Sequence, residues 1–121
     1  MCSSDLSTRK DILAKTIRLM CKEFKGRPEY LQVAFGPAIR SCCYEVGSEF
    51  KHFFSGGLIE RDGRYYLDLL GINKRQILDS GVKEANIFDS GICTFCKNED
   101  FFSYRKEGKS CGRIMSVIML R

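Results

Sequence analysis

The chain has 121 residues, of which 44% are hydrophobic, and its formal net charge is +5 at pH 7. This length suits one domain with one core and is too short for two. No stretch approaches the roughly 18 consecutive apolar residues of a membrane-spanning helix, and the start lacks the pattern of a signal peptide. The basic residues are spread among 15 acidic ones, which argues against a nucleic-acid partner. We therefore expect a cytoplasmic protein that binds neither nucleic acid nor a membrane.

The first part of the chain predicts a helix, a strand and a second short helix. Apolar residues recur at helical spacing across 7–25, and Gly26 supplies a stop. Residues 30–35 alternate in the manner of a strand, which a Gly-Pro step ends. Apolar spacings of four and three then suggest a short helix across 46–54.

The middle of the chain predicts a hairpin followed by a helix. Two short strands, 58–60 and 64–67, flank an Asp-Gly pair that tolerates the positive φ of a tight turn. Asp68 can cap the next helix, and Gly81 can serve as its C-terminal glycine.

Two further segments, 86–90 and 113–120, have strand character. The second is apolar enough to be a central strand buried on both faces. No repeat, low-complexity tract or linker divides the chain. The expected fold is α/β, with a mixed β-sheet flanked by helices.

Three segments resemble a known family: GPAIRSCCYEVGSEF at 36–50, YYLDLLGINKRQILDSGV at 65–82 and ICTFCKNEDFFSYRKEGKSCGRIMSVIML at 92–120. In order and spacing they are similar to the last part of the YfiH, or laccase-domain, family. The family pattern contains Gly-Pro-x-Ile, Glu-Val-Gly, Leu-Asp-Leu, Cys-Thr and Phe-Phe-Ser-Tyr-Arg-Arg. Departures are small, such as Lys106 in place of the second Arg of the last motif. The resemblance covers nearly all of residues 7–121.

The resemblance implies that residues 7–121 are the C-terminal half of a larger YfiH-like α/β sandwich. Members of the family resemble zinc-dependent enzymes that phosphorolyse purine nucleosides, including methylthioadenosine, and that deaminate adenosine. The implied partners are a purine nucleoside and phosphate. Older names call these proteins polyphenol oxidases or laccases. A blue-copper centre needs two histidines with a cysteine, and the single histidine, His52, cannot supply them.

The resemblance also implies metal ligands that this chain lacks. They are an upstream histidine, a cysteine in an Ala-Asp-Cys motif and a histidine in His-Ala-Gly-Trp-Arg, which aligns with the start of this chain. We therefore expect the chain to hold no zinc and to be inactive alone. The string Met-Cys-Ser-Ser-Asp-Leu at 1–6 is what a widely used sequencing adapter encodes when GTG is read as a start codon, so we interpret it as a non-native leader. Loss of the other half would expose sheet edges and favour self-association.

Arg105 and Arg113 are the candidate substrate-binding cations. Phosphorolysis needs a cationic pocket for phosphate, and a planar guanidinium group can hold an anion through two parallel hydrogen bonds. The alternative is that both are solvent-exposed arginines that flank strands.

The first family-like segment offers further candidates. Gly36, Pro37 and Cys43 could bring backbone amides to a substrate, and Glu45 could transfer a proton or accept a hydrogen bond. We favour a structural alternative, in which Glu45 braces the following helix and the cysteine packs as a small apolar group.

Seven cysteines form the remaining pattern. An odd number cannot all pair, so free thiols are expected in a reducing compartment. Cys93 and Cys96 have the separation of a metal or redox pair, and Cys42, Cys43 and Cys111 could complete a thiolate zinc site. Because no second Cys-x-x-Cys occurs, structural packing is the favoured interpretation and no metal ligand is assigned.

Two other functions stay open. A self-contained binding module would hold structural zinc through its cysteines and meet an acidic partner or RNA with its basic surface. A peptidoglycan editing role, a function given to bacterial relatives of the family, would remove a misincorporated amino acid. The residues offer nothing specific to that chemistry.

Overall fold

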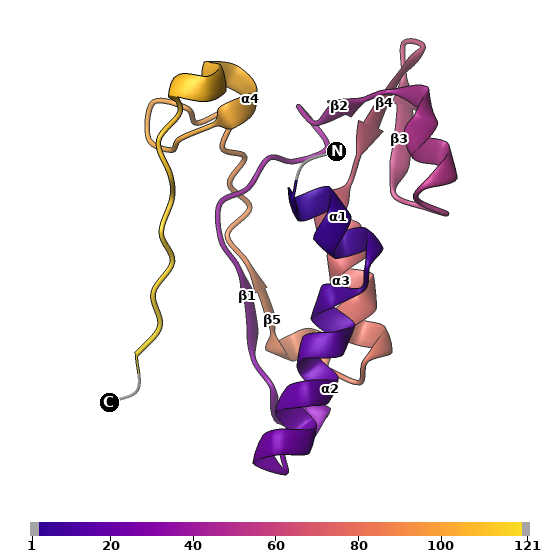
Figure 1. Cartoon of the computed structure of the whole chain (residues 1–121), viewed down its shortest axis with the longest axis vertical. Helices are drawn as coiled ribbons and strands as arrows, with labels where there is room; N and C mark the ends of the chain where they lie inside the picture. The colour runs from indigo at the N-terminus through magenta and orange to yellow at the C-terminus, as the bar shows by residue number, and fades with distance from the viewer. Residues whose placement is uncertain (1–2, 120–121) are drawn as a thin grey trace.

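Helices and two small sheets make up the fold, which a computed structural model describes for residues 3–119 (Figure 1). The regular elements are, in chain order, α1 (Ser3–Arg9), α2 (Ile12–Phe24), β1 (Val33–Phe35), β2 (Glu45–Val46), β3 (Leu58–Arg61), β4 (Arg64–Leu67), α3 (Leu69–Asp79), β5 (Ile87–Asp89) and α4 (Tyr104–Glu107). Four 3-10 turns, at Pro28–Tyr30, Ser48–His52, Glu84–Asn86 and Gly108–Ser110, connect them.

The strands form one parallel pair and one antiparallel sheet. β1 lies beside β5 with Val33 opposite Ile87, and the connection between them passes through α3. β4 lies between β2 and β3 in the antiparallel sheet. The α/β class is therefore confirmed, and the parallel and antiparallel pairings occur in two sheets rather than in one.

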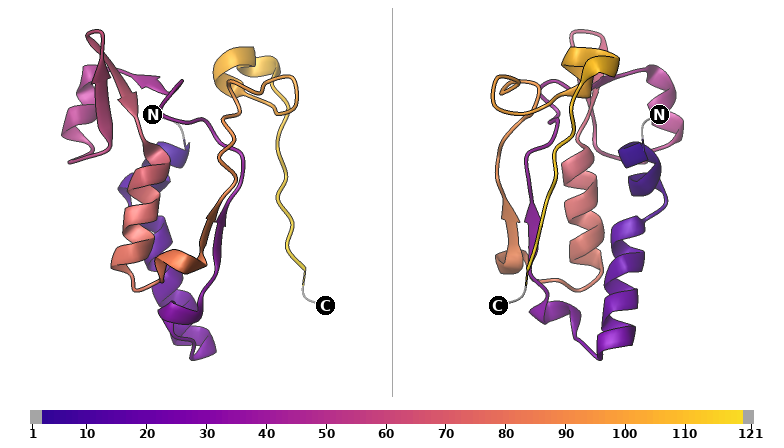
Figure 2. Two further views of the ribbon diagram at one scale, coloured as in Figure 1. Left: turned by 180° about the vertical axis from the view of Figure 1, so that it is seen from behind. Right: turned by 60° about the vertical axis from the view of Figure 1, so that its left-hand side comes forward.

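Helices α2 and α3 cover one side of the β1–β5 pair (Figure 2). Ile17 of α2, Ile77 of α3 and Val82 form the buried centre of this layer, and Val33 packs against it. Burial of such side chains drives the packing, at about 25 cal/mol per Å² of apolar surface. None of the helices within residues 3–119 is long and apolar enough to cross a bilayer.

A second core lies under the antiparallel sheet. Tyr44, Phe50, Phe54 and Leu67 are buried together, and the rings of Phe50 and Phe54 are stacked with their centroids 6.0 Å apart. The short helix predicted for 46–54 is a 3-10 turn, Ser48–His52, which contains Phe50, and Phe54 follows two residues after its end. Aromatic burial thus holds β2 and the hairpin together.

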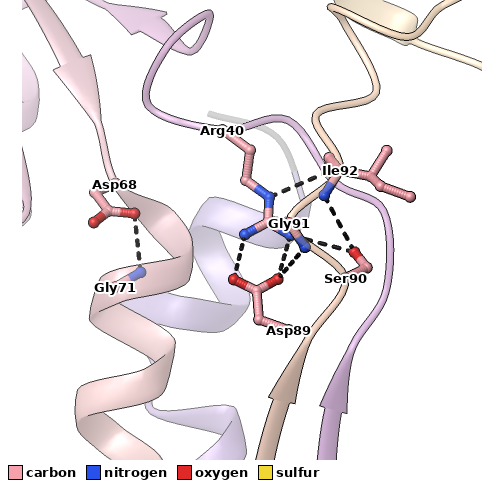
Figure 3. Close-up of polar contacts among 7 residues, drawn as sticks. All are labelled: Arg40, Asp68, Gly71, Asp89, Ser90, Gly91 and Ile92. Carbon is pink, nitrogen blue, oxygen red and sulfur yellow. Dashed lines mark hydrogen bonds and ion pairs between the residues drawn. The ribbon is translucent and has the colours of Figure 1, made fainter.

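Local signals in the middle of the chain are confirmed. Asp62 and Gly63 have φ angles of 51° and 72° and make the hairpin turn between β3 and β4. An oxygen of the Asp68 carboxylate accepts a hydrogen bond from the Gly71 amide at 3.0 Å and caps α3 (Figure 3). Gly81 follows α3 with a φ of 94°, as a C-terminal glycine does.

The helix predicted for 7–25 is instead two helices. Asp11, with a φ of 53°, separates α1 from α2. Gln76 of α3 donates to the Thr8 carbonyl and to the Asp11 carboxylate, so contacts with α3 stabilise the break.

The expected leader at 1–6 falls partly outside the described residues, which begin at residue 3. Residues 3–6 form the start of α1. Asp5 is buried and accepts a hydrogen bond from the Tyr44 hydroxyl. The origin of these six residues stays a prediction.

The strand predicted for 113–120 is wrong over the described part of that segment. Residues 111–119 run as the tail in yellow in Figure 1 without strand pairing. Ile118 is 97% exposed. A strand forms only against the edge of another strand, and none within residues 3–119 pairs with this tail.

Candidate functional site

An open cleft of about 950 Å³ lies between the segment around β2 and the segment that contains α4. Glu45, Arg105 and Arg113 line it together, although 60 residues separate the first two. Apolar and aromatic side chains line much of the rest, among them Ile39, Phe50, Phe102 and Ile114. A cleft of this size with a few convergent polar groups is typical of small-molecule sites.

Arg105 is held across one wall of the cleft. Its Nη1 donates to the Glu45 carbonyl at 2.9 Å, and its guanidinium lies 5.1 Å from the centroid of the Tyr44 ring. The buried Tyr44 side chain is itself fixed by the hydrogen bond to Asp5. Since a guanidinium has five N–H donors, Arg105 can be positioned by Glu45 and still bind an anion.

Arg113 lines the same cleft and follows Gly112, on which an aromatic ring packs. Its Nη1 donates to the carbonyls of Cys111 and Gly112, at 3.1 and 3.3 Å. The ring of Phe102 packs so closely on Gly112 that a Cβ there would lie 2.6 Å from it. Only glycine leaves room for this ring, which is 51% exposed and faces the cleft. The wall thus joins a cation to an aromatic face.

Glu45 contacts two arginines, one through its carboxylate and the other through its backbone carbonyl. The residue lies in β2, opposite Tyr66 of β4. Its carboxylate is 3.4 Å from Nη1 of Arg64 in the hairpin, and both side chains are exposed. The backbone carbonyl is the group that meets Arg105. The carboxylate thus pairs with the hairpin rather than with the following helical turn, and both the bracing role and the proton-transfer role stay predictions.

The structure places the other predicted site residues elsewhere. Gly36 and Pro37 follow β1 and do not line the cleft, and Cys43 belongs to a separate cluster. Sequence reasoning missed Phe102, although the Phe-Phe-Ser-Tyr-Arg motif that supplied Arg105 contains it.

Four cysteines lie close together beyond the C-terminal ends of the parallel strands β1 and β5. Cys42 and Cys43 lie in the turn after β1, and Cys93 and Cys96 lie in the turn after β5. Their Sγ atoms are all within 4.8 Å of one another. Within residues 3–119 they are the only group of three or more potential metal-ligating side chains.

The parallel pairing explains how residues 50 positions apart come together. A parallel bridge between Ala38 and Cys93 extends the pairing beyond β1 and β5, with the register shifted by one residue, and the Thr94 amide donates to the Ala38 carbonyl at 3.2 Å. Cys111, by contrast, lies beside Glu107, 3.4 Å from its carboxylate. The cluster therefore contains the Cys-x-x-Cys pair and the adjacent pair, and not Cys111.

The thiols of this cluster differ in acidity. Burial raises the pKa of Cys43 well above its usual range, and the neighbouring Cys96 thiol adds to the effect. Burial also acts to raise the pKa of Cys93, but hydrogen bonds from backbone amides, including that of Cys96, outweigh it and lower the pKa to about 6. The backbone around Cys93 therefore favours its thiolate form.

An ion pair braces the two turns (Figure 3). Arg40 donates to both carboxylate oxygens of Asp89 and, through Nε, to the Ile92 carbonyl at 3.2 Å. The hydrogen bonds from the Arg40 guanidinium to the Asp89 carboxylate, together with one from the Gly91 amide, lower the pKa of Asp89 to about 2. Arg40 lies two residues before Cys42, and Asp89 lies four residues before Cys93.

Residues 6–121 match the family model described as multi-copper polyphenol oxidoreductase laccase. The chain belongs to this family. It is 34% identical over 112 residues to "Purine nucleoside phosphorylase" of Aquifex aeolicus, covering 93% of this chain and 52% of that relative. It is 33% identical over 116 residues to "Adenosine deaminase RL5" of an unknown prokaryotic organism, covering 88% of this chain and 44% of that relative.

The fold of this laccase-family chain is also found in a solved structure. The crystal structure of Bacillus licheniformis hypothetical protein YfiH matches it with a TM-score of 0.75 and 26% identity, over 82% of this chain and 40% of that one. The chain thus spans about half the length of the curated relatives it matches.

The zinc ligands that the family resemblance implies include two histidines, which this chain does not provide. His52, its only histidine, is exposed in the turn Ser48–His52. The described residues therefore do not fit a histidine-containing site. The four-cysteine cluster nevertheless argues against the expectation that this chain holds no metal.

Proposed function

We propose that this chain is part of a purine nucleoside phosphorylase and supplies one wall of its substrate cleft. The observation that carries the proposal is that Arg105, Arg113 and the exposed face of Phe102 share one cleft. Two relatives support the reaction, one named as a purine nucleoside phosphorylase and the other as an adenosine deaminase.

Phosphorolysis makes two demands that this wall can meet. The bond from the ribose C1′ to the purine nitrogen breaks, and a bond from C1′ to a phosphate oxygen forms, so phosphate must be held close to the sugar. Arg105 and Arg113 would bind the phosphate oxygens, because guanidinium groups match their geometry. The ring of Phe102 would pack against the purine, since an aromatic face stacks on any base.

The same proposal extends to adenosine and methylthioadenosine as substrates of the complete protein. Deamination of adenosine relies on a metal to lower the pKa of bound water. The chain alone would be inactive, because its residues do not fit the family's histidine-containing site.

The test begins with the gene. We expect amplification of the locus to recover an upstream segment with Ala-Asp-Cys and His-Ala-Gly-Trp-Arg motifs, in place of the codons for residues 1–6. The complete protein should release adenine from adenosine or methylthioadenosine only when inorganic phosphate is present. Release without phosphate, or an upstream segment lacking both motifs, would contradict the proposal.

Variants of the complete protein then test the cleft. Arg105→Ala should raise the KM for phosphate at least tenfold, corresponding to about 1.4 kcal/mol of lost phosphate binding. Arg75→Ala is a matched control, because Arg75 lies exposed on α3 and pairs with Asp79 away from the cleft. Equal effects of the two substitutions would remove Arg105 from the site.

A further inference from the structure

We propose that Cys42, Cys43, Cys93 and Cys96 bind one zinc ion through four thiolates. The ion would join the turn after β1 to the turn after β5. This site is separate from the cleft lined by Arg105 and Arg113, called the purine cleft below because we propose that it binds a purine nucleoside. Its donors are also separate from the histidine-containing set of the family.

The spacing of the sulfur atoms suits a tetrahedral ion. With Zn–S bonds of about 2.3 Å, the corners of a sulfur tetrahedron lie about 3.8 Å apart. The Sγ of Cys96 is 3.8 Å from that of Cys42 and 3.3 Å from that of Cys43. With all six separations below 4.8 Å, small side-chain rotations would complete the tetrahedron.

The donor set determines both the metal and its role. Thiolates are soft ligands that prefer zinc among the divalent ions common in cells, and their four sulfurs would fill every position of a tetrahedral ion. No coordination position then stays open for water or substrate, which is the mark of a structural site. Binding would release the protons of those cysteines that are still thiols, leaving four thiolates on the ion.

The surrounding backbone is already arranged around the site. The Lys97 amide donates to the Cys93 carbonyl at 3.0 Å, and the Cys43 amide donates to the Arg40 carbonyl at 2.9 Å, so each turn is closed by its own hydrogen bonds. Arg40 and Asp89 tie the two turns together. Preorganisation of this kind lowers the entropic cost of collecting four ligands.

The site would also position the purine cleft. Cys43 precedes Tyr44, and Cys93 precedes Thr94, and both of these neighbours line the cleft. An ion that fixes the two turns would therefore hold two parts of the cleft wall at a constant separation.

The first measurement is the zinc content of the full chain. Protein purified under reducing conditions with added zinc chloride, then desalted, should retain one zinc ion per chain by elemental mass spectrometry. Cys93→Ser and Cys96→Ser should lose it, whereas Cys21→Ser and Cys111→Ser should retain it, since those residues lie outside the cluster. Zinc retained after loss of Cys93, or absent from the parent chain, would overturn the proposal.

Cobalt and a second variant keep the test decisive if the serine variants misfold. Cobalt(II) bound to the parent chain should give the intense visible absorption of a tetrahedral thiolate site. Cys96→His should keep a bound ion with a shifted spectrum, because imidazole replaces one sulfur. Octahedral-type cobalt absorption, or a disulfide within the cluster under reducing conditions, would also overturn it. None of these readouts depends on phosphorylase activity.

Discussion

The guanidinium of Arg40 donates to both carboxylate oxygens of Asp89, at 2.8 and 2.5 Å, and so ties the turn after β1 to the end of β5. Only 15% of the Arg40 side-chain surface is exposed, compared with 42% for Asp89. Because β1 and β5 run parallel and are connected through α3, one ion pair links segments 49 positions apart.

This ion pair predicts a loss of stability at low pH. The hydrogen bond from Arg40 lowers the pKa of Asp89 from its ordinary 3.8 to about 2, so the stabilisation is present above 3.8 and is lost as the pH falls through 2. Partial exposure weakens the pair, and Asp89→Asn should reduce the free energy of unfolding by about 1 kcal/mol at pH 7. Urea unfolding at pH 7 and pH 2 measures the effect.

The matched control for this prediction is Asp79→Asn, which removes an exposed pair within α3. Its unfolding free energy should stay close to that of the parent chain. If Asp89→Asn and the parent lose the same stability between pH 7 and pH 2, Asp89 does not carry the linkage.

Leu67 should be the most sensitive position of the core beneath the antiparallel sheet. It is fully buried at the end of β4. Leu67→Ala should lower the free energy of unfolding by about 2–5 kcal/mol, through lost burial and the cavity left behind. Thermal and urea unfolding provide the measurement. Ile59→Ala serves as the control, because Ile59 is 40% exposed on neighbouring β3, and it should cost clearly less.

Local signals account for the parts of the fold that the sequence predicted well. The hairpin and α3 follow from Asp62, Gly63 and Asp68, whose effects act within a few residues. The break at Asp11 depends instead on Gln76, which is distant in sequence. The strand predicted at 113–120 was wrong for the same reason. Its apolar composition indicates a buried strand, but a strand forms only beside the edge of another strand.

The two sites also differ in whether local sequence or distant contacts determine them. Arg105 and Arg113 were found from a motif and do line one cleft. The Cys-x-x-Cys spacing suggested a thiolate site with Cys42, Cys43 and Cys111, but structural packing was favoured, because only the parallel pairing of β1 and β5 shows that the two turns meet. Cys111 has the same side chain and lies outside the cluster.

The cap of α3 predicts a measurable contribution to stability. Asp68→Ala removes the acceptor for the Gly71 amide and should lower the free energy of unfolding by about 1 kcal/mol. Asp68→Asn keeps an acceptor oxygen and should lose much less, which separates the cap from a general effect of substitution. Equal losses in urea unfolding would show that the hydrogen bond is not the cause.

The apolar tail predicts self-association of the chain. Met115, Val117 and Ile118 are 84%, 77% and 97% exposed, and the segment is extended with its backbone groups outside any sheet. Such an edge can pair with a second copy. Light scattering should show a mass that rises with concentration, and Ile118→Lys should reduce the rise because a charge resists burial in the contact. Leu19→Lys places the same charge at an exposed position on α2 and should leave association unchanged. A monomer at every concentration would show that the tail does not pair between copies.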